Sequence, residues 1–149
     1  MVEMARLPAR FAFVLLALFL CGIAASPASA QRVYYVDETG AAANGGTSFS
    51  DALPLQEALS QATGADAIVI AEGVYVPGST ADTSFTITGG QDGLKVYGGW
   101  AGTESFTGVS DVQSRLDSRD LAAHRTVLSG DVDGDDDPFA PYTDSDADT

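Results

Sequence analysis

The sequence predicts an all-β domain in which short parallel strands are wound into a coiled solenoid. Short apolar segments alternate with turns that carry glycine at nearly every corner, and this pattern leaves no room for the crossover helices of a doubly wound α/β domain. A single amphipathic helix stands ahead of most strands, and a solenoid needs such a helix to cover the exposed apolar end of its first rung. An antiparallel sandwich is the other all-β architecture considered, but it does not explain a single amphipathic helix ahead of the strands.

The first 30 residues precede that domain and have the three parts of a cleavable secretory signal peptide. These parts are a positive start with Arg6 and Arg10, an apolar run from Phe11 to Leu20, and the small-x-small site Ala28-Ser29-Ala30. The apolar run is shorter than the roughly 20 residues that span a bilayer, so cleavage is favoured over a stable transmembrane anchor. We therefore expect a mature chain that begins near Gln31 and is secreted or held at the cell surface.

The mature chain is strongly acidic. The whole sequence has 21 acidic and 7 basic residues, and cleavage removes Glu3, Arg6 and Arg10, so 20 acidic and 5 basic residues remain with a net charge of −15. This charge excludes nucleic acids and anionic membranes as partners, because binding them requires basic side chains that neutralise phosphates. Cations, neutral sugars and basic surfaces remain possible partners. The only cysteine, Cys21, lies in the signal peptide, so disulfides and thiolate metal sites are excluded from the mature chain.

The mature chain begins with a strand and a helix. Val33 to Val36 is β-branched and aromatic, and the Gly/Ala/Asn-rich segment from Asp37 to Thr47 ends this strand as a turn. A helix is expected from Pro54 to Thr63, with Ser50 or Asp51 as its cap and Gly64 as its stop. Its apolar stripe consists of Leu55, Leu59 and Ala62.

The remaining elements are short strands. The apolar run from Ala67 to Ala71 predicts a strand that is covered on both faces. Gly98-Gly99 is expected to form a turn, and a long connection without helix is expected from Trp100 to Arg125. The other predicted strands are Val74 to Val76, Ser84 to Thr88, Leu94 to Tyr97, and Thr126 to Ser129.

Five segments of the chain carry a resemblance to a known family. They are VYYVDETG, GTSFSDALPLQEAL, ADAIVIAEGVYVPG, LKVYGGWAGTES and TVLSGDVDGDDD. In this order they resemble the N-terminal region of secreted bacterial right-handed parallel β-helix proteins with a pectin-lyase-like fold, whose G-x-Y-x-P turn is matched by Gly73 to Pro77. The resemblance covers roughly Val33 to Asp137. It implies that residues 31–130 are an N-terminal cap and the first coils of a longer protein.

The sequence contains no catalytic constellation. Arg119 with Asp117 and Asp120 could be an arginine beside paired carboxylates, but a solvated loop with local salt bridges is the favoured interpretation. His124 is the only histidine and has no serine or cysteine at a meaningful spacing, which indicates an ordinary loop residue. The resemblance places catalytic side chains on middle coils, which lie beyond these residues.

Three aromatic residues in one region offer a possible sugar-binding surface. Tyr97, Trp100 and Phe106 could form a platform that stacks on a sugar ring. The favoured interpretation is that they pack beneath the long connection that follows them.

The acidic end of the chain is the only place with metal-ligand chemistry. Residues 131–149 carry eight aspartates, no basic residue, and glycine and proline breakers, so we expect a loop or a disordered tail. Asp131, Asp133, Asp135 and Asp137 are candidate Ca²⁺ ligands, because Ca²⁺ takes six to eight oxygen ligands. No EF-hand register fits them, so a solvated acidic loop that only attracts cations is the alternative.

We expect a secreted or cell-surface β-helix protein with a non-catalytic binding or adhesive role, and carbohydrate is a candidate ligand. The alternative is the N-terminal part of a polysaccharide lyase or glycoside hydrolase whose active site lies beyond residue 149. The fold itself does not choose between these roles, since one fold carries many functions.

Export generates the first testable prediction. Mass spectrometry of the exported protein is expected to show an N-terminus at or within a few residues of Gln31, because the small side chains of Ala28 and Ala30 suit the signal peptidase. Material that retains Met1 outside the cytoplasm would contradict the cleavable signal peptide.

Overall fold

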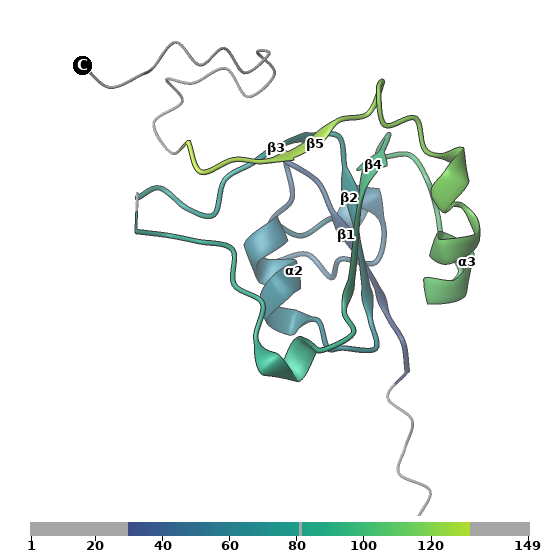
Figure 1. Ribbon diagram of the computed structural model, residues 1–149, viewed down its shortest axis with the longest axis horizontal. Coiled ribbons are helices and arrows are strands. Elements are labelled where there is room, and N and C mark those ends of the chain that lie inside the picture. The colour runs from purple at the N-terminus through teal and green to yellow at the C-terminus, as the bar shows by residue number, and fades with distance from the viewer. Residues whose placement is uncertain (1–29, 81, 132–149) are drawn as a thin grey trace, which may run out of the picture.

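The structure is a computed structural model that describes residues 30–80 and 82–131 (Figure 1). Its strands and helices follow one another along the chain as β1 (Val33–Val36), α2 (Leu55–Gln61), β2 (Ala67–Ala71), β3 (Gly73–Tyr75), β4 (Lys95–Trp100), α3 (Val109–Ser114) and β5 (Thr126–Leu128). Three short 3-10 turns accompany them, η1 (Phe49–Asp51), η2 (Gly89–Gln91) and η3 (Leu116–Ser118).

The strands form two parallel sheets. One sheet has the order β1-β2-β4 and the other consists of β3 and β5. β2 continues directly into β3, and β4 leads through the α3 segment into β5, so each of these two passes of the chain contributes one strand to each sheet. Figure 1 shows β3 and β5 together across one end of the three-stranded sheet. The predicted short parallel strands are therefore confirmed.

The prediction that the domain has no room for crossover helices is wrong. β1 and β2 are adjacent and parallel, and α2 lies in the connection between them, which is a βαβ arrangement. A second helix, α3, lies within the connection from Trp100 to Arg125, where no helix was expected. The two helices lie on opposite sides of the three-stranded sheet (Figure 1). The described fold is thus a small domain of short parallel strands with little helix.

Alternating side chains of the sheet divide the core into two clusters. On one face, Ile68 and Ile70 of β2 pack with Tyr34 and Val36 of β1 and with the buried side of α2. On the other face lie Tyr35, Val69, Trp100, Phe106 and Val112. All five residues of β2 are buried, so the predicted cover on both faces of this strand is confirmed.

The α2 helix is shorter than predicted and has a different cap. Pro54 is its N-cap residue and Ala62 its C-cap residue, while Asp51 belongs to η1 and does not cap α2. The predicted stripe is confirmed, since Leu55, Leu59 and Ala62 are each no more than 5% exposed. At the C-terminal end the buried Gln91 donates from Nε2 to the carbonyl oxygens of Leu59 and Ala62, which satisfies acceptors that a helix end leaves free.

Two other predictions are wrong because strand pairing overrides local pattern. Apolar and polar residues alternate from Ser84 to Thr88 as in a strand, but this segment pairs with no strand of the described residues. Without a partner strand its backbone forms no inter-strand hydrogen bonds. Gly98 and Gly99 do not form a turn, because they lie inside β4. There the register shifts from the pair Val69 and Tyr97 to the pair Ala71 and Trp100, and Gly99 has φ +83°, as expected for a β-bulge.

In the described part of the chain, no helix has the length and apolar character that crossing a bilayer requires. The predicted signal peptide lies outside the described residues except for its last residue, Ala30.

The packing of α2 generates the second prediction. Leu59→Asp is expected to lower the free energy of unfolding by about 3 kcal/mol or more, because Leu59 is 3% exposed and its replacement buries an unpaired carboxylate. Ser60→Asp adds the same charge at the exposed neighbouring position and is expected to change stability by about 0.5 kcal/mol or less. Denaturant unfolding measures both changes, and equal stability of the two variants would show that α2 is not docked through Leu59.

Candidate functional site around His124

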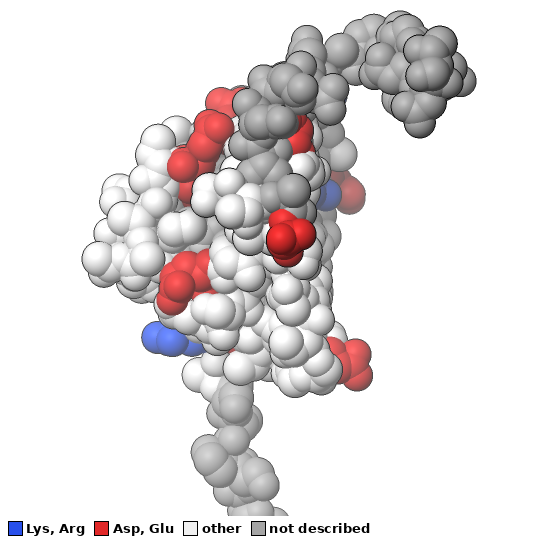
Figure 2. Space-filling model, turned by 90° about the vertical axis from the view of Figure 1, so that its left-hand side faces the viewer, with Lys and Arg blue, Asp and Glu red and all other residues white. Residues whose placement is uncertain are grey.

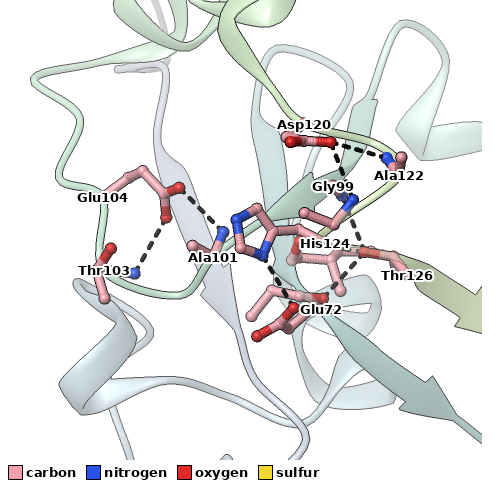
Figure 3. A network of polar contacts seen from close by, with 12 residues as sticks. Glu72, Gly99, Ala101, Thr103, Glu104, Asp120, Ala122, His124 and Thr126 are labelled. Carbon is pink, nitrogen blue, oxygen red and sulfur yellow. Dashed lines mark hydrogen bonds and ion pairs between the residues drawn. The ribbon is translucent and has the colours of Figure 1, made fainter.

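The pairing of β3 with β5 brings together two polar residues that are far apart in the sequence. Gly73 is the register partner of Thr126, so the residues just before each strand lie side by side, and Gly73 N donates to Arg125 O at 3.0 Å. Glu72 occupies the corner between β2 and β3, and His124 lies two residues before the first residue of β5. His124 Nδ1 lies 2.9 Å from Glu72 Oε2, as Figure 3 shows.

Two further carboxylates face the same region from different loops (Figure 3). Glu104, after β4, accepts hydrogen bonds from the backbone N–H groups of Ala101 at 2.9 Å and Thr103 at 3.1 Å. Asp120 accepts from the backbone N–H groups of Ala122 and Ala123 at 3.1 Å and 2.9 Å, which stabilises the turn before His124. Both carboxylates therefore order their own loops.

The surrounding carboxylates change the protonation of His124. The hydrogen bond with Glu72 raises the pKa of His124 above its usual value of 6.5, and the negative charges of Glu72, Asp120 and Glu104 raise it further. Desolvation acts in the opposite direction but is a smaller effect than the hydrogen bond. The imidazole thus keeps its proton to a higher pH than an isolated histidine does.

A shallow hollow of about 360 Å³ lies next to this network. It is lined by Gly98, Gly99, Arg119, Leu121, His124, Arg125, Thr126 and Val127. Arg119 donates from Nη1 to Gly98 O at 2.7 Å and from Nε to Leu116 O at 2.9 Å, and its guanidinium lies 5.6 Å from the centre of the Trp100 ring. These contacts make Arg119 a structural residue that joins η3 to β4.

The imidazole of His124 is the proton-carrying group of this site. Thr126, whose side chain lines the same hollow, accepts at Oγ1 from Gly99 N at 2.9 Å and donates from Oγ1 to Ala71 O at 3.0 Å. A hydroxyl acts as a nucleophile when it lies within hydrogen-bond reach of its base, and among the described residues no hydrogen bond joins Thr126 Oγ1 to His124. The geometry therefore supports a histidine that links loops, which is the loop role predicted from the sequence.

The structure does not bring the predicted catalytic candidates together. Arg119 bonds to carbonyl oxygens and Asp120 to backbone N–H groups, so the two make no ion pair. Arg115, which lies two residues before Asp117, instead forms an ion pair with Asp111, with Nε and Oδ1 2.9 Å apart. This pattern agrees with local salt bridges in a solvated loop, the interpretation favoured from the sequence.

The candidate aromatic platform is also not present at the surface. Trp100 is 2% exposed and Phe106 is 9% exposed, and their rings meet in a T-shaped arrangement with centroids 4.8 Å apart. Tyr35 Oη accepts a hydrogen bond from Phe106 N at 2.7 Å and holds the long connection over the sheet. The prediction that these aromatics pack beneath the long connection is confirmed, and the hypothesis of an exposed sugar-stacking platform is wrong.

The candidate Ca²⁺ ligands lie at the limit of the described residues. Asp131 is the last described residue, and Asp133, Asp135 and Asp137 lie outside the described residues. Within residues 30–80 and 82–131, no three or more His, Asp or Glu side chains are arranged to hold a metal ion. The Ca²⁺ site at the acidic end therefore stays a prediction.

The polar network generates the third prediction. Because the pKa of His124 is raised in the folded state, its contribution to stability is fully present below pH 6.5 and is lost as the pH rises through the folded-state pKa. Glu72→Gln is expected to move the pKa of His124 towards 6.5 and to reduce this loss. NMR titration of the single histidine, with denaturant unfolding at each pH, measures both effects.

Glu57→Gln is the matched control for this prediction, since Glu57 lies on α2 and bonds to Gln61 at 2.8 Å. It is expected to leave the titration of His124 unchanged. A pKa of His124 at or below 6.5 in the unaltered chain would contradict the assigned role of Glu72.

Comparison of the chain with models of known protein families, with curated proteins and with solved structures found no match. The resemblance to right-handed parallel β-helix proteins therefore stays a prediction based on the five sequence segments. Support for a function comes from the residues and geometry of the chain itself.

Proposed function

We propose that this chain is an exported right-handed parallel β-helix protein, and that the described residues form its N-terminal cap and first coils. Its role is non-catalytic binding or adhesion at the cell surface, with carbohydrate as the ligand class. The observation that carries the proposal is an apolar core that is covered at one end and open at the other.

The open end is visible in the burial of paired strand residues. Register partners in a parallel sheet point to the same face, yet Ile68 of β2 is fully buried while its partner Val96 of β4 is 38% exposed. In the second sheet, Tyr75 of β3 is 5% exposed while its partner Leu128 of β5 is 53% exposed. The apolar face thus extends onto the last strands without cover, which supports further coils stacked on β4 and β5.

The opposite end is closed by the chain itself. Tyr35 in β1 donates from N to Gly46 O at 3.0 Å and accepts at its carbonyl from Leu53 N at 2.9 Å, so the loop that precedes α2 covers the free edge of β1. A solenoid needs this kind of cover at its first rung, because an unpaired edge invites association with other chains. The asymmetry of the two edges supports the role of a cap at the β1 end.

The surface chemistry supports binding without catalysis. In the described residues, the histidine and the carboxylates around it take part in local hydrogen bonds that order the loops. Figure 2 shows acidic side chains in separate groups with uncharged surface between them. The strong negative charge disfavours anionic polymers and leaves neutral or basic surfaces as ligands.

The open end generates the fourth prediction. The purified exported chain is expected to self-associate as its concentration rises, because the edges of β4 and β5 can pair with strands of a second copy. Val96→Lys places a charge at the open edge and is expected to weaken this association about tenfold or more without lowering the melting temperature by more than a few degrees. Sedimentation at a series of concentrations measures the association.

Ile87→Lys is the matched control, because Ile87 is 62% exposed but lies outside both sheets. It is expected to leave self-association unchanged. A chain that stays monomeric at every concentration, or an equal effect of both lysine variants, would contradict a strand-docking end.

A further inference from the structure

A second hollow, of about 290 Å³, lies between α2 and the segment that leads into η2. In Figure 1 this segment passes along the side of α2 that faces away from the sheet. Gln91 holds it there through its hydrogen bonds to Leu59 O and Ala62 O, and Phe85 packs against the core cluster beside α2. The hollow is therefore framed by a helix and by a segment that is fixed to it.

The lining of this hollow carries no charged side chain. Its polar side chains are Gln56 and Ser60 from α2 and Thr86, Thr88 and Gln91 from the opposite segment. Leu59 and Ala62 form its apolar base, where 3% of Leu59 and 5% of Ala62 are exposed. In a mature chain with a net charge of −15, a hollow lined by neutral amides and hydroxyls is a distinct chemical environment.

Several of these polar groups can still bond to a ligand. Ser60 Oγ donates to Glu57 O at 2.8 Å, and Thr88 Oγ1 donates to Gln91 Oε1 at 3.2 Å, so each hydroxyl keeps lone pairs that can accept. The exposed Gln56 side chain makes no hydrogen bond within the described residues and offers both donors and an acceptor. The hollow thus presents a mixed set of donors and acceptors within a short span.

We propose that this hollow, framed by Gln56, Ser60 and the 86–91 segment, binds one or two units of a neutral sugar chain. Neutral sugars present vicinal hydroxyls that both donate and accept, together with apolar C–H surface, and the lining matches both features. No cationic group is present to hold a carboxylate or phosphate, and no carboxylate is present to hold an amine. The volume lies at the lower end of the range of ligand pockets, which suits a small unit of a longer chain.

This inference rests on the proposed binding role and assigns it a site and a ligand class. The site lies beside the capping helix and apart from the hollow next to His124, because the two have no lining residue in common. A sugar bound there leaves the open edges of β4 and β5 free for further coils.

The fifth prediction tests the site with soluble probes. The exported chain is titrated with three neutral glucose hexamers, of β-1,4, β-1,3 and α-1,4 linkage, and with an anionic alginate hexamer. Backbone amide shifts are recorded by NMR. Saturable shifts confined to residues 56–62 and 86–91 are expected with at least one neutral hexamer and not with alginate.

Two double variants give the matched comparison. Gln56→Ala with Ser60→Ala removes side-chain contacts at the site and is expected to weaken binding about tenfold or more, since each lost hydrogen bond costs a factor of a few. Gln113→Ala with Ser114→Ala makes the same changes on α3, where Ser114 Oγ donates to Asp111 O at 2.8 Å as Ser60 does to Glu57. This control is expected to bind within about twofold of the unaltered chain.

Three outcomes would overturn the inference. If a neutral hexamer binds but both double variants bind it equally well, the site is wrong and the binding role stands. If alginate binds as well as the neutral hexamers, the ligand class is wrong. If no hexamer binds, this site is excluded and carbohydrate is removed from the proposed function, while the self-association of the Val96→Lys variant still tests the β-helix architecture.

Discussion

The central strand β2 is the constraint on which the rest of the structure depends. Its five residues are apolar and buried, so both of its faces and both of its edges need partners. β1 and β4 occupy the edges, α2 covers one face, and α3 with the long connection covers the other. An apolar strand of this kind cannot be stable at the surface of a small domain, so the chain must wrap around it from both sides.

Buried polar groups fix the segments that wrap around β2. Asp66, just before the strand, accepts from Arg32 N and Thr63 N, each at 2.8 Å, and so joins the start of β1 to the end of α2. Gln91 does the same for η2 and the C-terminal end of α2. No buried side-chain nitrogen or oxygen of the described residues lacks a partner, as expected when each such bond carries a structural role.

The sequence predicts the elements whose pattern is local. The apolar run of β2 and the stripe of Leu55, Leu59 and Ala62 depend only on neighbouring residues, and both lie where they were expected. The helix α3 could not be predicted in this way, because it has six residues with only Val109 and Val112 buried. The contact of His124 with Glu72 could not be predicted either, since it requires the pairing of β3 with β5 across 52 positions of sequence. The hollow beside α2 likewise depends on the position of residues 84–88. Their alternating pattern predicted a strand, but they form none, and part of this segment lines the hollow instead.

The bulge in β4 has a consequence for the direction of a single large side chain. Successive residues of a strand point to opposite faces, so Trp100 would share the face of Val96 and point towards α2 if β4 were regular. The bulge at Gly98 and Gly99 absorbs one residue and reverses this direction. The indole therefore lies on the α3 side with Tyr97, whose carbonyl accepts from Trp100 Nε1 at 3.0 Å. The bulge, and not the number of glycines, thus keeps the largest side chain of the domain in the same core as Tyr97. A residue that cannot adopt the positive φ of Gly99 would favour a regular strand, in which the indole points into the space that α2 already fills.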